Sequence, residues 1–108
     1  MNPYHYSHEK CQETVRFLAL SIKPLQQRLA DAYMLAFIML DRSVLPDDLH
    51  TRFDDIGVIL TPSREGQTIR TIAQNLTDDQ ARKVINDLLS FADQVAELYY
   101  LAEREQAG

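Results

Sequence analysis

The feature that most restricts the fold of this chain is a regular apolar stripe in its last third. From residue 81 to residue 102, apolar side chains recur at alternating steps of four and three residues. They are Ala81, Ile85, Leu88, Ala92, Val95, Tyr99 and Ala102. This spacing places them along one face of an α-helix. Just before the stripe, Thr77-Asp78-Asp79-Gln80 matches a capping box, in which Thr77 caps the Gln80 amide and Gln80 reaches back. The sequence therefore predicts a helix from Thr77 to about Glu103.

The rest of the chain shows the same helical period, and no segment alternates with a period of two for long. We expect four further helices, over 7–22, 24–41, 47–60 and 67–76. Ser7 is expected to cap the first helix, and Pro24 suits the first position of the second. Asp47 and Asp48 stand in the first turn of the third helix, where the helix dipole favours them. The predicted fold class is all-α, as a compact antiparallel bundle of four main helices plus one short helix.

The length of the chain and its single cysteine indicate how many domains it forms and in which compartment it folds. A chain of 108 residues is the size of one domain. We expect a single helical domain over 1–108, with a flexible N-terminal tail at 1–6 and a fraying C-terminus at 104–108. Cys11 is the only cysteine, which favours a reducing compartment. The longest apolar run, Ala32 to Leu40, falls short of the ~20 residues that a membrane span needs. We therefore expect a cytoplasmic protein that does not enter a membrane.

The predicted second helix is apolar all round over Ala32–Leu40. At 100° per residue, Met34 and Ile38 point away from its main apolar face and lie beside Gln27 and Asp31. One interpretation is a central helix surrounded by its neighbours. The other is an exposed patch at Met34 and Ile38 that receives a partner or forms a homodimer.

The charge of the chain is acidic and unevenly distributed. The net charge is −5, from 11 basic and 16 acidic residues, which opposes nucleic-acid binding through a basic face. Residues 41–55 hold five aspartates against two arginines, and residues 84–108 hold five acidic residues against one arginine. Residues 9–28 instead hold four basic residues against two acidic ones. In the third helix, Asp47, Asp48, Asp54 and Asp55 form either a solvated face or a docking surface for a basic partner.

Residues that could support catalysis or metal binding are few. His5, His8, Glu9 and Cys11 are close in sequence, but no second Cys or His pair completes a zinc site. Cys11 lies on an apolar stripe with Val15 and is expected to be a buried, inert core residue. No glycine-rich phosphate loop and no nucleophile motif occurs. We therefore expect no catalytic residue, no metal and no cofactor.

A small DNA-binding regulator with a helix-turn-helix is the alternative function. The segments 67–76 and 77–89 have suitable lengths, and Arg70, Arg82 and Lys83 could face phosphates. Neighbouring aspartates and the acidic balance of the chain oppose this alternative.

The sequence favours a non-catalytic module that binds another protein, with a basic partner preferred. Bacterial immunity proteins and antitoxins, which neutralise basic enzymes through charge complementarity, are examples of this class, and adaptor proteins are another. The predicted partner-binding residues are Met34, Ile38, Asp47, Asp48, Asp54 and Asp55.

Overall fold

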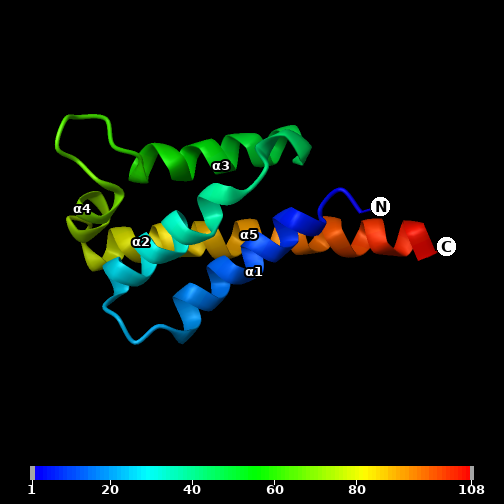
Figure 1. Ribbon diagram of the computed structural model, residues 1–108, viewed down its shortest axis with the longest axis horizontal. Coiled ribbons are helices and arrows are strands. Elements are labelled where there is room, and N and C mark those ends of the chain that lie inside the picture. The colour runs from blue at the N-terminus through cyan, green and yellow to red at the C-terminus, as the bar shows by residue number, and fades with distance from the viewer. Residues whose placement is uncertain (1, 108) are drawn as a thin grey trace.

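The computed structural model describes residues 2–107, and the regular elements among them are helical (Figure 1). The α-helices are α1 (His5–Leu20), α2 (Leu25–Leu35), α3 (Asp47–Leu60), α4 (Ile69–Gln74) and α5 (Asp78–Ala107). Two 3-10 turns, η1 (Phe37–Met39) and η2 (Arg42–Val44), connect α2 to α3. No strand occurs in this range, so the predicted all-α bundle of four main helices and one short helix is confirmed.

The 30-residue α5 is the axis on which the other helices pack (Figure 1). Its length follows from the apolar stripe, of which Ala81, Leu88, Ala92 and Val95 are buried, and Val84 and Phe91 beside the stripe are buried as well. The predicted capping box is confirmed at its start. The Thr77 amide donates to Gln80 Oε1 at 2.9 Å, and the Gln80 amide donates to Thr77 Oγ1 at 3.1 Å.

The helices α1 and α3 both run antiparallel to α5. The start of α1 lies beside the end of α5, because the His8 and Tyr99 rings stack with centroids 4.2 Å apart. The start of α3 also lies there, since Pro46 and Leu101 line one groove. Further along α3, Arg52 donates hydrogen bonds to side-chain oxygens of Ser90 and Gln94. As a result, α5 packs against α1 on one side and against α3 on another.

Three phenylalanines from three segments form the centre of the core. The Phe37 ring packs against the Phe53 ring of α3 at 5.2 Å and edge-on against the Phe91 ring of α5 at 5.1 Å, measured between centroids. Phe37 and Phe91 are almost completely buried. A cluster of this kind stabilises the fold through buried area and through ring geometry.

The predicted second helix is wrong at its C-terminal end. We expected it to continue to Asp41, but α2 ends at Leu35, and Ala36 leaves helical geometry with φ −139° and ψ −60°. The break turns Phe37 into the aromatic cluster and leaves Leu40 buried beyond it. Packing of Phe37 against rings distant in sequence therefore overrides the helical pattern of the local sequence.

The boundaries of the other helices agree with the prediction to different degrees. The third helix begins and ends as predicted, and the short helix is confined to 69–74. The first helix starts at His5 and ends at Leu20, so Ser7 is not its cap but a buried residue inside it. The expected free tail at 1–6 is also wrong for its described part, because the Asn2 amide donates to the Tyr99 carbonyl oxygen and to Glu103 at 2.9 Å each. At the other end α5 continues to Ala107, and residues 1 and 108 lie outside the described range.

Candidate functional site

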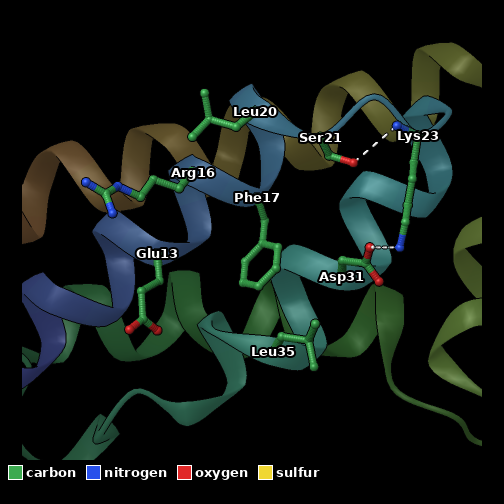
Figure 2. Close-up of a pocket in the computed structure, with 8 residues that line it drawn as sticks. All are labelled: Glu13, Arg16, Phe17, Leu20, Ser21, Lys23, Asp31 and Leu35. Atoms are coloured by element: carbon green, nitrogen blue, oxygen red, sulfur yellow. Dashed lines mark hydrogen bonds and ion pairs between the residues drawn. The ribbon is translucent and has the colours of Figure 1, made fainter.

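An open groove with a volume of about 670 Å³ lies between α1 and α2 (Figure 2). We call it the α1–α2 groove. Its centre is apolar, and Figure 2 shows Phe17 pointing from α1 into the space between the two helices toward Leu35 of α2, whereas Leu20 lies at the edge of the groove on the upper side of α1. Leu20 is 76% exposed and Leu35 is 50% exposed. Large apolar side chains that lie together and remain open to water are typical of a binding surface.

Charged side chains stand at both ends of the α1–α2 groove (Figure 2). Glu13 and Arg16 lie at one end, and Lys23 and Asp31 lie at the other. Lys23 Nζ is 2.9 Å from Asp31 Oδ2, and Arg70 Nη2 of α4 is 2.8 Å from Asp31 Oδ1. The hydrogen bond from Lys23, followed by that from Arg70, lowers the pKa of Asp31 although burial opposes the shift.

The predicted apolar patch at Met34 and Ile38 depended on a continuous second helix, and that assumption is wrong. Because the chain leaves helical geometry at Ala36, these two residues do not stack on one helix face. Met34 is half-buried and Ile38 is exposed. Apolar exposure in this segment falls mainly on Leu35, Ile38 and Met39. Leu35, which the periodicity of the sequence did not single out, is the member of this segment that lines the α1–α2 groove.

A second, smaller groove of about 210 Å³ lies between the start of α3 and the C-terminal half of α5. We call it the α3–α5 groove. Its lining residues are Pro46, Asp48, Leu49, Gln94, Glu97, Leu98 and Leu101. Asp48 and Glu97 come from the two acidic segments of the chain, and packing of α3 on α5 brings these segments together. Among residues 2–107, no basic nitrogen lies within 4.0 Å of the Asp48 or Glu97 carboxylate.

The four predicted aspartates of α3 do not share one face. Asp48 and Asp55 lie seven residues apart on the side that meets α5, and Asp55 lines a small hollow with Asp87. Asp47 and Asp54 lie on another side of the helix. Asp47 is fully exposed, with Oδ1 3.8 Å from His50 Nδ1.

Asp54 is already engaged within the chain. The Arg42 guanidinium forms a two-pronged pair with it, with Nε–Oδ1 at 2.9 Å and Nη2–Oδ2 at 2.6 Å. The hydrogen bonds from Arg42 lower the pKa of Asp54. Of the four predicted aspartates, Asp48 and Asp55 are therefore the two that lie beside acids of α5.

The acid and the two leucines that α5 contributes to the α3–α5 groove were missing from the sequence prediction. Gln94, Glu97, Leu98 and Leu101 follow at steps of three, one and three, so they share one face of the helix. That face lies beside the main stripe, of which Leu98 is not a member. The sequence did contain a signal for this surface, namely a second apolar face of the helix with an acid at its edge.

Metal-ligand residue types near the N-terminus have structural roles in the described part of the chain. Cys11 is 2% exposed, so its predicted burial is confirmed, and burial raises the pKa of its thiol to about 12. His8 is buried against Tyr99, and burial followed by the charge of His5 lowers its pKa. Between residues 2 and 107, no three His, Cys, Asp or Glu side chains gather as a metal site would need.

The segments proposed for a helix-turn-helix place their basic side chains against carboxylates. Arg70 pairs with Asp31 at 2.8 Å, Arg82 with Asp79 at 3.3 Å, and the Lys83 ammonium with the Asp87 carboxylate at 3.5 Å. The first segment forms only the six-residue α4, and the second begins with two aspartates in the first turn of α5. A recognition helix would present this end to DNA, where carboxylates repel phosphates.

Comparisons with known proteins and the search for membrane segments gave no functional assignment. In the part of the chain that the structure describes, no helix is both long enough and apolar enough to cross a membrane. No protein-family model, no curated protein and no solved structure matches this chain.

Proposed function

We propose that this chain is a non-catalytic protein-interaction module that binds a basic segment of another protein in the α3–α5 groove. The observation that carries the proposal is that Asp48 and Glu97 line one groove together with Leu98 and Leu101. Two carboxylates without a basic partner in the described chain attract a lysine or arginine. The neighbouring leucines offer apolar area for the side chains that flank it.

The surroundings of the groove support the same partner chemistry. Asp47 is exposed on another side of α3, and Asp55, Asp87 and Arg52 line a hollow further along the same pair of helices. Because Asp87 pairs with Lys83 and Arg52 lies in the same hollow, the negative potential is concentrated at the α3–α5 groove itself. Such a potential accelerates the encounter with a basic protein and favours one orientation. A groove between two helices that is lined by carboxylates and by Leu98 and Leu101 suits the basic edge of an amphipathic helix.

Several biological roles use such a contact. Immunity proteins and antitoxins that block basic enzymes depend on charge complementarity of this kind, and an adaptor protein would use the same surface to hold a basic partner. The proposal therefore includes neutralisation of a basic enzyme and the holding of a basic partner by an adaptor. The buried free thiol of Cys11 is consistent with action in the reducing cytoplasm.

The proposal is tested by nuclear magnetic resonance titration of the ¹⁵N-labelled chain with a synthetic amphipathic helical peptide of leucine and lysine. We expect the shift changes to concentrate at Asp48, Gln94, Glu97, Leu98 and Leu101. A peptide with the same lysines and with serine in place of leucine serves as the control and should bind more weakly. Shift changes that spread evenly over all acidic residues, or equal binding of the two peptides, would contradict the proposal.

A further inference from the structure

A basic side chain, Arg52, lies beside the acidic α3–α5 groove. Asp48, Arg52 and Asp55 follow at steps of four and three residues, so they share the face of α3 that meets α5. Arg52 is therefore one helical turn from Asp48, or ~6 Å along the helix axis. The order of charges along this face of α3 is negative, positive and negative.

The Arg52 guanidinium is held by neutral groups of α5. Its Nη2 donates to Ser90 Oγ at 2.9 Å, and its Nη1 donates to the side-chain oxygen of Gln94. Gln94 also lines the α3–α5 groove, so these bonds fix the guanidinium at the edge of this groove. Among residues 2–107, no carboxylate oxygen lies within 4.0 Å of an Arg52 side-chain nitrogen. The hydrogen bonds thus position the cation without neutralising it.

The small hollow next to the groove does not supply the missing carboxylate. Asp55 and Asp87 line this hollow with Arg52, but both carboxylates are more than 4.0 Å from its nitrogens. Asp87 pairs instead with Lys83 at 3.5 Å. On the other side of Arg52, the two carboxylates of the groove also lack a basic partner in the described chain. A partner that binds here therefore meets charges of both signs, one helical turn apart.

From these features we propose that Arg52 is a specificity-determining residue of the α3–α5 groove. It selects a partner helix in which an acidic residue lies one turn from the basic residue that Asp48 and Glu97 hold. Side chains at i and i+4 share one face of such a helix, ~6 Å apart along its axis, which matches the spacing from Asp48 to Arg52. A second basic residue at this position is repelled by Arg52, whereas an acidic one is attracted. The inference rests on the proposed binding of a basic segment and adds which segments the groove accepts.

The first test compares two helical peptides that differ at one position. Each contains leucines and one lysine, and four residues after the lysine one peptide has glutamate and the other has glutamine. A helix can lie in either direction along the groove, so one acidic position is sufficient. We expect the glutamate peptide to bind the unchanged chain about threefold more tightly, as one partly exposed charge pair provides.

Net charge alone predicts the reverse order of affinities. The chain has a net charge of −5, so an added negative charge on the peptide should weaken binding unless a cation receives it. Equal or weaker binding of the glutamate peptide would overturn the proposal.

A variant and its matched control assign the preference to Arg52. Arg52→Gln removes the cation, and Arg82→Gln removes an equal charge near the start of α5, where Arg82 pairs with Asp79. The preference for glutamate should disappear in Arg52→Gln and persist in Arg82→Gln. The same two peptides are compared on each chain, so differences in their own helicity cancel. A preference that survives in Arg52→Gln would contradict the assignment.

The outcomes separate this inference from the proposed function. If the glutamine peptide shifts the resonances of the groove but glutamate gives no advantage, the groove binds basic segments and Arg52 does not select among them. If neither peptide shifts these resonances, the proposed function fails and this inference fails with it. If Arg52→Gln does not fold, the Arg52 Nε–H resonance of the unchanged chain decides. It should shift further with the glutamate peptide than with the glutamine peptide, and equal shifts would overturn the proposal.

Discussion

Asp31 of α2 and Arg70 of α4 form an ion pair, with Oδ1 and Nη2 2.8 Å apart, that joins two helices almost forty residues apart in the chain. Lys23 approaches the other carboxylate oxygen at 2.9 Å. The Asp31 side chain is only 7% exposed, whereas each basic partner remains about half exposed. The carboxylate is thus covered by the two basic side chains that it holds, and it connects the α1–α2 loop, α2 and α4.

Removing the Asp31 carboxylate should weaken the fold modestly. Because Lys23 and Arg70 are half exposed, water screens both pairs, and we expect Asp31→Asn to lower the free energy of unfolding by about 1 kcal/mol. The control is Asp87→Asn, whose 3.5 Å pair with Lys83 is more exposed and should change the value by less than about 0.5 kcal/mol. Urea unfolding measures both. Equal losses in the two variants would show that Asp31 has no special structural role.

The lowered pKa of Asp31 also determines the acidic pH range in which its contribution to stability is lost. The folded pKa lies below the ordinary value of 3.8. The stabilisation is therefore fully present above pH 3.8 and is lost as the pH falls through the lower, folded value. The difference in unfolding free energy between the unchanged chain and Asp31→Asn should disappear in this acidic range, and a difference that persists there would contradict the assignment.

His8 should make stability depend on pH in a higher window. Burial against Tyr99 lowers its pKa below the ordinary value of 6.5, so the folded chain resists protonation that the unfolded chain accepts. The free energy of unfolding should fall as the pH decreases from 6.5 towards the folded pKa, and then level off. A His8→Phe variant keeps a ring on Tyr99 and retains His5 and His50. Urea unfolding at about pH 7.5 and about pH 5.5 should show a smaller difference in this variant; an unchanged difference would assign the effect to other groups.

Gly57 is a position where substitution should stabilise the chain. It lies inside α3, where glycine is less favourable than alanine by about 1 kcal/mol. A Cβ atom at this position would lie 3.4 Å from the Tyr33 hydroxyl oxygen and 3.9 Å from Thr61 Oγ1, which are ordinary contacts. We expect Gly57→Ala to raise the free energy of unfolding by about 0.5–1 kcal/mol. A lower value would mean that the Tyr33 hydroxyl cannot adjust, and Tyr33→Phe in the same background should then restore stability.

Cys11 should react slowly with thiol reagents in the folded chain. Its thiol is buried and has a pKa of about 12, so the reactive thiolate is scarce at neutral pH. Labelling should become fast only in denaturant. A matched control is Ala19→Cys in a Cys11→Ala background, since Ala19 is exposed on the same helix. Rapid labelling of native Cys11 at a rate near that of the control would contradict its place in the core.

Local sequence signals were sufficient for most of the fold. The 4–3 spacing and the Thr77–Gln80 capping box depend only on neighbours within one or two turns, and α5 follows them. The break after Leu35 depends instead on Phe53 and Phe91, which reach Phe37 only in the folded bundle. For the same reason, the periodicity placed Asp31 opposite the main apolar face of the second helix but could not show that Arg70 covers it in the structure.

The candidate binding surface could be predicted only in part. Asp48 and Asp55 were identified because charge can be counted along the sequence. Glu97, Leu98 and Leu101 were not, because their relation to Asp48 exists only after α3 packs on α5. Asp54 is the opposite case. It was predicted to bind a partner, but in the fold its carboxylate is already paired with Arg42, twelve residues away.

The central claim, that Asp48 and Glu97 bind a basic segment, is tested most directly by one comparison of affinities. The leucine–lysine peptide is titrated into Asp48→Lys/Glu97→Lys and into Glu9→Lys/Glu65→Lys, whose reversed residues are exposed on α1 and in the α3–α4 loop. Both variants change the net charge equally, so overall attraction falls by the same amount. We expect the groove variant to bind at least tenfold more weakly than the control, a difference of ~1.4 kcal/mol, with a weaker dependence on salt. Equal affinities of the two variants would contradict the claim.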